Sequence, residues 1–231
     1  MNVYEYMVLP FIEIEIRLGT MGKTFDSSID RKYFEKITSF LETGDWEQIL
    51  YKNTIEYCKK NQKLITDKDE SFVLLKENLL KKDFQLNSSP FDIRYSINQE
   101  FKFKSKPNVS FDKEGSITRQ KTRKSFINEN FRYDMTIVNE ISNNINKTKY
   151  EIEIELIINK VNITWTPDYI NDFLECKIYD LINIVEPLER NKFKINLIKE
   201  TSSLNFNKLS LNDNNFNLNL NFDEKCSIKS N

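Results

Sequence analysis

The chain has 231 residues, 39% of them hydrophobic, so it can bury one sizeable core as a large domain with or without a small appendage. Its 34 Lys and Arg residues nearly cancel its 35 Asp and Glu residues, which excludes a uniformly basic nucleic-acid-binding surface and leaves local segregation of charge as the basis of any electrostatic binding. There is no histidine, which excludes catalysis by a histidine base and every zinc site that needs imidazole.

The cysteines, glycines and apolar runs indicate the cellular compartment and the way in which phosphates can be bound. Three widely spaced cysteines, Cys58, Cys176 and Cys226, favour inert thiols in a reducing compartment over a disulfide framework. No apolar run approaches membrane-spanning length, and the charged N-terminal segment is not a signal peptide, so we expect a soluble intracellular protein. Its four glycines form no phosphate-binding loop, so side chains must hold any bound phosphate.

Apolar residues recur at strand spacing over most of the chain and at helical spacing in two places. Alternation from Leu9 to Leu18 predicts a strand that Gly19 to Gly22 breaks, and helical spacing from Asp30 to Leu41 predicts a helix that Gly44 ends. Short apolar runs predict further strands at residues 49–57, 63–66, 72–76, 80–86 and 91–97.

The second half of the chain follows a turn-rich segment at residues 106–115. Thr166-Pro167-Asp168 starts a helix whose apolar spacing continues to Pro187. Strands are predicted at residues 117–126, 131–138, 149–163 and 193–198. Residues 201–231 are rich in Asn and Ser and are either a tether toward a downstream domain, with one weak strand, or an ordinary terminus. We therefore expect a domain at residues 1–200 and an Asn-rich tail or linker at residues 201–231.

The most informative pattern is a glutamate alternation that occurs twice. Glu13 and Glu15 flank an isoleucine near the N-terminus, and Glu151, Glu153 and Glu155 alternate with isoleucines about two-thirds of the way along. In a strand, the glutamates of each cluster share one face roughly 6–7 Å apart, where they repel unless water screens them or a cation lies between them. Two such strands facing each other predict an oxygen-only site for Mg²⁺ or Mn²⁺. The alternative is a pair of amphipathic strands with solvated outer faces.

Basic residues alternate along the strands between the two glutamate clusters. Those that share strand faces are Arg119, Lys121 and Arg123, then Arg132 with Asp134, Arg94 with Asp92 and Ser96, and Lys102 with Lys104. If the apolar faces of these strands point outward against the two helices, the charged faces line the bore of a closed antiparallel barrel, where opposite charges compensate each other. Such a bore suits a polyphosphate, because Arg and Lys hold phosphate oxygens while glutamates hold the cation.

These residues, in this order, resemble the triphosphate tunnel metalloenzyme family, and within it the metal-dependent RNA 5′-triphosphatases of fungal and viral mRNA capping enzymes. The family's opening Glu-x-Glu-x-Arg/Lys-x-Gly strand is similar to Glu13 to Gly19, and its last tunnel strand, with three alternating glutamates, is similar to Glu151 to Glu155. Its Lys-x-Arg and Arg-x-Asp strands resemble Lys121 to Arg123 and Arg132 to Asp134, and its mid-chain arginine resembles Arg94. The fold class is then α+β, mainly antiparallel β: a closed eight-stranded barrel, or tunnel, with a charged interior and flanking helices.

The resemblance also implies roles for the tunnel residues. The metal, Mg²⁺ or Mn²⁺, would be bound by Glu13, Glu15, Glu155 and Glu151. The attacking water would be oriented by Glu153 and Asp134, with Arg132 as a third catalytic residue. The β- and γ-phosphates would be held by Arg94, Lys121, Arg123 and Arg132. For the family's further tunnel lysine Lys104 is the nearest candidate, and its mid-tunnel glutamate has no clear counterpart.

The implied function is removal of the γ-phosphate from triphosphate-ended RNA, the first step of mRNA cap formation. The expected partners are the 5′-triphosphate RNA end, NTP as a secondary substrate and a fused or associated guanylyltransferase, with no membrane. The Asn, Lys and Ile content is typical of an AT-rich genome, so we expect a large DNA virus or a protist as the source and the cytoplasm, a virion or a viral factory as the location. Two alternatives stay open: a tunnel hydrolase or cyclase acting on tripolyphosphate, thiamine triphosphate or ATP, and a non-catalytic polyanion-binding module.

Overall fold

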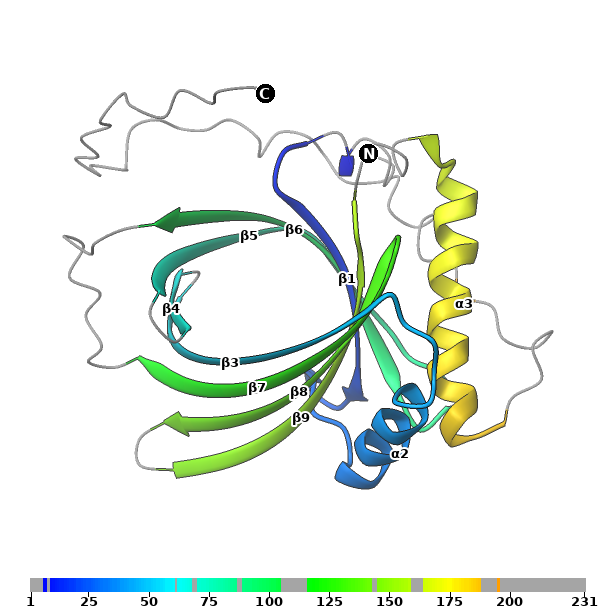
Figure 1. The fold of residues 1–231 in the computed structure, drawn as a ribbon, viewed down its shortest axis with the longest axis horizontal. Coiled ribbons are helices and arrows are strands. Elements are labelled where there is room, and N and C mark those ends of the chain that lie inside the picture. Colours follow the sequence, from blue (N-terminus) through cyan, green and yellow to red (C-terminus); the bar gives the residue numbers. More distant parts are fainter. Residues whose placement is uncertain are drawn as a thin grey trace.

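Eight antiparallel strands close into a barrel, and two helices lie against one side of it (Figure 1). The computed structural model describes residues 6–7, 9–60, 62–67, 70–86, 89–104, 116–142, 145–158, 164–187 and 195. Around the barrel the strand order is β1-β6-β5-β4-β3-β7-β8-β9, and β1 pairs with β9 to close it. The predicted fold class, a mainly antiparallel closed eight-stranded barrel with flanking helices, is confirmed.

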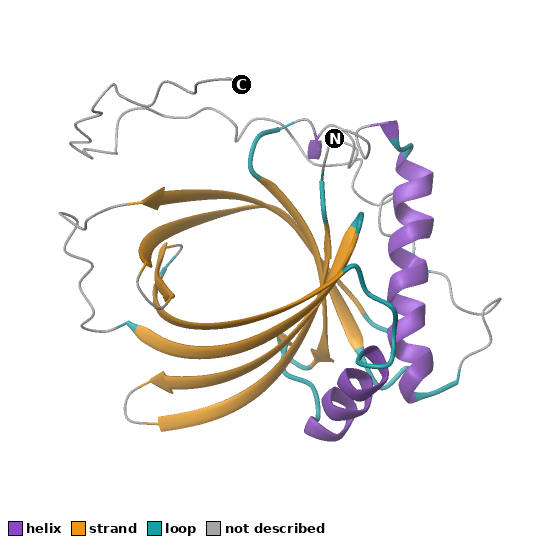
Figure 2. Cartoon of the chain, in the orientation of Figure 1, coloured by secondary structure: helices purple, strands orange, loops and turns teal. Residues whose placement is uncertain are grey.

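The helices and strands have these bounds, and Figure 2 shows how the strands wrap while the helices stay on one side. The barrel strands are β1 (Ile12–Met21), β3 (Gln48–Lys59), β4 (Gln62–Asp67), β5 (Glu70–Phe84), β6 (Asp92–Lys104), β7 (Ile117–Asn128), β8 (Phe131–Ser142) and β9 (Ile145–Leu156). The short strand β2 (Phe25–Asp26) pairs with the end of β1. The helices are α2 (Arg31–Leu41) and α3 (Pro167–Val185).

Several predicted strands differ from the observed ones. The predicted break of the first strand at Gly19 was wrong, because β1 continues through Gly19 to Met21, and β6 extends beyond the predicted residue 97 to Lys104. The runs at residues 72–76 and 80–86 form a single strand, β5, whose register against β6 shifts between Asn78 and Leu80. Extending the last barrel strand to residue 163 was wrong, because β9 ends at Leu156. The strand expected at residues 193–198, apart from Ile195, and the tail at residues 201–231 lie outside the described residues.

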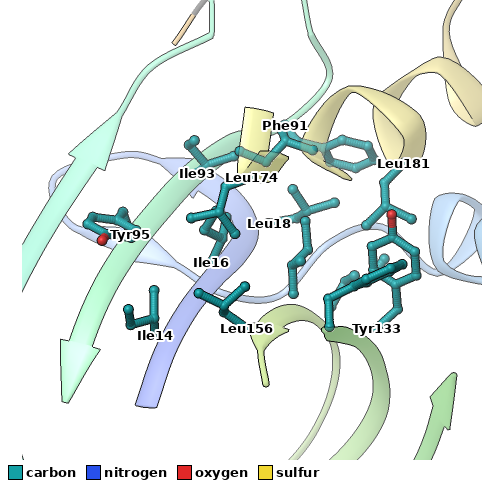
Figure 3. Packing of buried hydrophobic residues seen from close by; sticks show 14 of the residues in the cluster. Ile14, Ile16, Leu18, Phe91, Ile93, Tyr95, Tyr133, Leu156, Leu174 and Leu181 are labelled. Atoms are coloured by element: carbon teal, nitrogen blue, oxygen red, sulfur yellow. The ribbon is translucent and has the colours of Figure 1, made fainter. Parts of the chain in front are cut away.

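The apolar core lies outside the barrel, between its wall and the helices. Ile14, Ile16 and Leu18 alternate with the charged residues of β1, and all three are fully buried. They belong to one cluster with residues of β6, β9 and α3, among them Ile93 and Leu174 (Figure 3). Burying one such side chain stabilises the fold by about 1.5–3 kcal/mol, and a slip of one residue would turn it toward the bore. Hydrophobic burial therefore fixes which side chains face inward.

Local capping explains where the two helices begin and end. Asp30 accepts a hydrogen bond from the Lys32 backbone amide at the start of α2, and the Gly44 amide donates to the Leu41 carbonyl just beyond its end. Thr166 caps α3. Both helices were predicted from their apolar spacing. Among the described segments, no helix has the length and apolar character needed to cross a membrane.

Candidate active site

Strand pairing brings the two glutamate clusters together inside the barrel. Across the β1–β9 seam, Glu15 is opposite Glu155 and Arg17 is opposite Glu153. On the other side of β9, Asp134 of β8 is opposite Glu153. The glutamates of the first and last strands therefore meet inside the barrel as predicted, but they lie side by side on paired strands and not on facing walls. The solvated-face alternative does not apply, since Glu15 and Glu153 are only 5% and 4% exposed.

Glu153 stands at the centre of a network of opposite charges. Its two carboxylate oxygens lie 2.9 Å from the guanidinium groups of Arg17 and Arg123. Burial alone would raise its pKa, but these two arginines hold the pKa of Glu153 well below its usual range. The neighbouring Asp134 is fully buried and accepts from Arg123 at 2.8 Å, Arg132 at 3.0 Å and the Ser125 hydroxyl. Glu153 is therefore ionised, and Asp134 accepts three hydrogen bonds.

Glu13 lies at the same end of the bore as Glu15 but has less positive charge around it. Lys76 of β5 ion-pairs with Glu13, and its ammonium also lies 3.5 Å from Glu15 and 3.2 Å from Glu100. Burial and the neighbouring Glu15 raise the pKa of Glu13 to about 7, in spite of Lys76. At Glu15 burial is outweighed by Arg17 and Lys76, which lower its pKa. One lysine is thus shared by three carboxylates, and the negative charge of Glu13 is only partly neutralised.

Glu155, on the neighbouring strand β9, also has too little positive charge around it. Burial raises its pKa to about 8 against the opposing charge of Arg132, which ion-pairs with it. The charges of Glu13, Asp134 and Glu153 add to the rise. Glu13 and Glu155 lie on neighbouring paired strands, and each has a single cationic partner among the residues that the structure describes.

Three of the predicted metal ligands, Glu13, Glu15 and Glu155, form a donor set that fits a hard divalent cation. They offer only carboxylate oxygens, which Mg²⁺ and Mn²⁺ prefer. The raised pKa values of Glu13 and Glu155 mean that this group holds protons unless further positive charge is supplied. Within the described ranges, no three Asp, Glu or Cys side chains already lie in ligating geometry; Lys76 and Arg132 hold two of the carboxylates instead.

The fourth predicted ligand, Glu151, lies further along β9 with a different cation. Arg119 donates to it at 2.6 Å, and the Ser27 hydroxyl at 3.1 Å. On the inner face of β9, Glu153 separates it from Glu155. The structure therefore does not bring Glu151 together with the other three predicted ligands.

Lys121 and Arg94, two of the predicted phosphate ligands, are each held by one carboxylate. Lys121 is buried, which lowers its pKa, and its ammonium lies 2.9 Å from Glu56 of β3. Arg94 donates twice to Asp83, at 2.6 and 2.9 Å, and stacks over the Phe25 ring at 4.5 Å. With Arg123 and Arg132 in the central network, the structure places all four predicted phosphate ligands on the inner wall.

The glycine that closes the opening motif has a steric role. A Cβ at Gly19 would lie 2.2 Å from the Asp26 carbonyl oxygen and 2.5 Å from the Phe25 ring. Only glycine allows β2 to approach β1 so closely. Since the Phe25 ring lies under the Arg94 guanidinium, Gly19 positions a residue of the bore through two contacts.

The chain is similar to known proteins in sequence over part of its length and in fold over most of it. The family model described as the mRNA capping enzyme, beta chain, matches residues 73–171, which run from β5 into α3. The S. pombe Pct1 RNA triphosphatase aligns with a TM-score of 0.58 at 15% identity, over 79% of this chain and 85% of that chain. The mimivirus capping enzyme triphosphatase aligns with a TM-score of 0.55 at 17% identity, over 80% and 95%.

The chain has the triphosphate tunnel fold. The resemblance predicted from the ordered motifs is thereby confirmed. The RNA triphosphatase domain of a trifunctional mimivirus mRNA capping enzyme also aligns, with a TM-score of 0.56 at 20% identity over 79% of this chain and 92% of that chain. No curated protein sequence matches the chain.

Two tunnel residues were missed because strand pairing, not a motif, places them. Lys76 reaches the glutamates from β5, whose register shift disturbs the parity on which the sequence prediction relied. Lys104, the nearest candidate for this lysine, has a side chain that is 87% exposed and lies 3.9 Å from Glu70. Glu56, buried in the middle of the tunnel, is the partner of Lys121.

Arg17 was part of the matched motif but was given no role. Its guanidinium lies 3.2 Å from Glu15 and 2.9 Å from Glu153, so it joins the two glutamate strands. Arg17 is two residues from Glu15 and therefore lies on the same strand face, which could have identified it as a tunnel residue.

Proposed function

We propose that this chain removes the γ-phosphate from the 5′-triphosphate end of nascent RNA, the first step of mRNA cap formation, with Mg²⁺ or Mn²⁺ as the cofactor. The observation that carries the proposal is the meeting of the two glutamate clusters with the basic strands inside one closed tunnel, most of it within the segment that the capping-enzyme model matches. In-line phosphoryl transfer needs mainly positioning and neutralisation of charge. This tunnel offers both.

The cations of the tunnel would bind and orient the triphosphate. Asp134 holds Arg123 and Arg132 in place, so two guanidinium groups are oriented before a substrate arrives. Arg94 and Lys121, each already paired with a carboxylate, extend the positive lining. Guanidinium groups match phosphate oxygens in a two-point geometry, so the arginines set the orientation of the γ-phosphate.

Glu13, Glu15 and Glu155 would hold the metal, which supplies positive charge at the phosphate oxygens when it is bound. When the cation binds, Glu13 and Glu155 would release their protons. The cation would then neutralise the carboxylates that Lys76 neutralises only in part. Glu151, which contacts Arg119, would instead fix that arginine in the tunnel wall.

Glu153 would orient the attacking water. Because Arg17 and Arg123 lower its pKa, Glu153 is ionised at neutral pH, so it would accept a hydrogen bond from the water but act only as a weak base. Asp134 was expected to share this role. Asp134 accepts three hydrogen bonds, from Arg123, Arg132 and Ser125, whereas each oxygen of Glu153 contacts one arginine, so we assign to Asp134 the positioning of the two arginines that it contacts.

Release of phosphate from γ-labelled, triphosphate-ended RNA in the presence of Mn²⁺ tests the proposal. Wild-type protein should hydrolyse this RNA and leave a diphosphate end. Tripolyphosphate, thiamine triphosphate and the formation of cyclic AMP from ATP are measured in parallel. If only these small triphosphates react, the chain is another enzyme of the tunnel fold and the RNA assignment is wrong.

Replacing a tunnel carboxylate separates an enzyme from a polyanion-binding module. Glu13→Ala or Glu153→Ala should lower metal-dependent turnover by orders of magnitude. A non-catalytic module would hold its polyanion as well or better after either change, because negative charge is removed. Glu35→Ala, on the exposed face of α2, is the matched control and should leave turnover unchanged.

We further propose that the chain acts with a fused or associated guanylyltransferase, with NTP as a secondary substrate. One structural neighbour comes from a trifunctional mimivirus mRNA capping enzyme, and S. pombe Pct1 also aligns in a complex with the Spt5 CTD. A viral source, a location in the cytoplasm, virion or viral factory, and a linker role for residues 201–231 would fit this arrangement. Transfer of guanylate onto the diphosphate-ended product in a coupled assay tests whether the product suits such a partner.

A further inference from the structure

The tunnel cavity has lysines at its edge that the proposed chemistry does not use. A cavity of about 310 Å³ is lined by the tunnel cations Arg17, Lys76 and Arg94 and by three further lysines, Lys60, Lys63 and Lys81. Lys60 lies in the turn between β3 and β4, Lys63 lies in β4, and Lys81 lies in β5. We call these three the rim lysines.

Ion pairing distinguishes the rim lysines from the other cations of this cavity. Arg17, Lys76 and Arg94 each contact at least one carboxylate at 3.2 Å or less. In the part of the chain that the structure describes, none of the rim lysines forms an ion pair. Lys63 acts on Glu56 only at longer range, where its charge helps to lower the pKa of that carboxyl. The rim therefore carries positive charge that no described carboxylate neutralises.

Exposure places the rim lysines on the solvent side of the cavity. Lys60 and Lys81 are exposed and Lys63 is half-buried, whereas Lys76 and Arg94 are 17% and 23% exposed at their side chains. An anion that enters the cavity at this end meets the rim lysines before it reaches the paired cations. A lysine ammonium is hydrated and mobile, which suits the recognition of phosphate charge without regard to base sequence.

We propose that the rim lysines bind the first phosphodiester groups of the RNA chain, next to the triphosphate that enters the tunnel. This inference rests on the proposed function and adds the part of the site that distinguishes RNA from small triphosphates. The 5′-triphosphate has its counter-charges inside the tunnel, while the phosphodiesters that follow it lie on the solvent side. Tripolyphosphate has no such groups, so it gains nothing from the rim.

The test compares two substrates in the variant Lys60→Ala/Lys63→Ala/Lys81→Ala. With triphosphate-ended RNA of about ten nucleotides, KM should rise, and the slope of log KM against log salt should fall by roughly 0.7 for each phosphodiester group that the variant no longer binds. With tripolyphosphate, KM should stay within about twofold of wild type, as should kcat for both substrates, because the rim would bind the RNA chain equally before and during the reaction. Lys32→Ala, on α2 outside the barrel with a side chain 65% exposed, is the control and should match wild type with both substrates.

The possible outcomes separate this inference from the proposed function. If KM rises equally for RNA and tripolyphosphate, or for neither, the rim lysines do not bind phosphodiesters and the inference is overturned. A wild-type protein that hydrolyses tripolyphosphate but not RNA overturns the proposed function instead, before any variant is made. Binding of a 5′-hydroxyl RNA at low salt, followed by fluorescence anisotropy, tests the rim without catalysis: the triple variant should lose this binding, and unchanged binding would overturn the inference.

Discussion

Four glutamates from β1 and β9 surround the tunnel centre, yet they form two unlike pairs. Glu15 and Glu153 each contact two cations, and their pKa values are lowered. Glu13 and Glu155 each contact one cation, and their pKa values are raised to about 7 and about 8. The side chains of Glu15 and Glu153 are only 6% exposed and those of Glu13 and Glu155 are 17% exposed. Burial alone would therefore give Glu15 and Glu153 the higher pKa values. The number of cationic partners therefore decides the direction of each pKa shift. Glu13 and Glu155 have too few of them.

The largest effect should come from Glu153→Gln, because this change leaves two partly buried arginines, Arg17 and Arg123, without a shared counter-charge. We expect a loss of stability of roughly 3 kcal/mol. We also expect kcat to fall at least about 1,000-fold, because the water and both arginines lose their orientation. Thermal unfolding and phosphate release on the same preparation measure the two effects. A variant that keeps wild-type melting and more than a tenth of the activity would contradict the central role of Glu153.

Glu13→Gln and Glu155→Gln should separate activity from stability. At pH 6.5, below the raised pKa values of both carboxyls, the protonated form predominates in the metal-free protein, so an uncharged amide resembles the group that it replaces. We expect nearly unchanged melting in EDTA, a loss of the stabilisation by Mn²⁺, and kcat lowered about 100-fold. Melting curves with EDTA and with Mn²⁺ check this. If both variants melt far below wild type in EDTA, the two carboxyls are charged structural groups and the comparison fails.

The pH dependence of stability should also distinguish Glu13 and Glu155 from Glu15 and Glu153. Between about pH 4.5 and pH 7 to 8, the folded protein keeps protons on Glu13 and Glu155 that the unfolded chain has released, so these two groups make the metal-free protein less stable as pH rises. Glu15 and Glu153 act in the opposite sense, because their lowered pKa values contribute stability that is lost as pH falls below the usual carboxyl range.

Melting temperatures measured in EDTA from pH 5 to pH 8.5 test this sign. Mn²⁺ should raise the melting temperature more at pH 8 than at pH 6, since it displaces protons from its ligands. The double variant Glu13→Gln/Glu155→Gln should flatten the decline. An identical pH profile in wild type and double variant would mean that other groups cause it.

Strand alternation was enough to predict the barrel and most of its lining. A period of two assigns Glu13 and Glu153 to one face and the isoleucines beside them to the other, and burial of those isoleucines enforces the assignment. The position of Lys76 could not be predicted in this way, because the register shift between Asn78 and Leu80 depends on pairing with β6.

The sequence also did not predict which residues form ion pairs with each other. Asp134 was predicted to orient water from its motif alone, whereas its hydrogen bonds to Ser125 and to two arginines depend on how β7 and β8 pair. Glu56 became a tunnel residue only when β3 was paired with β7. The faces of a strand are encoded locally, but contacts between strands depend on which strands pair and in what register.

The smallest effect should come from Glu35→Gln, which breaks a pair of the same chemistry in a different setting. Glu35 accepts from Arg31 at 2.7 Å, as short as the pairs of the tunnel, but the two side chains are 57% and 69% exposed. In water this pair loses little hydration and gains little attraction, so neither the melting temperature nor kcat should differ measurably from wild type. Differential scanning calorimetry beside Glu153→Gln makes the contrast direct. A clear loss of stability in Glu35→Gln would show that distance, and not burial, sets the strength of these ion pairs.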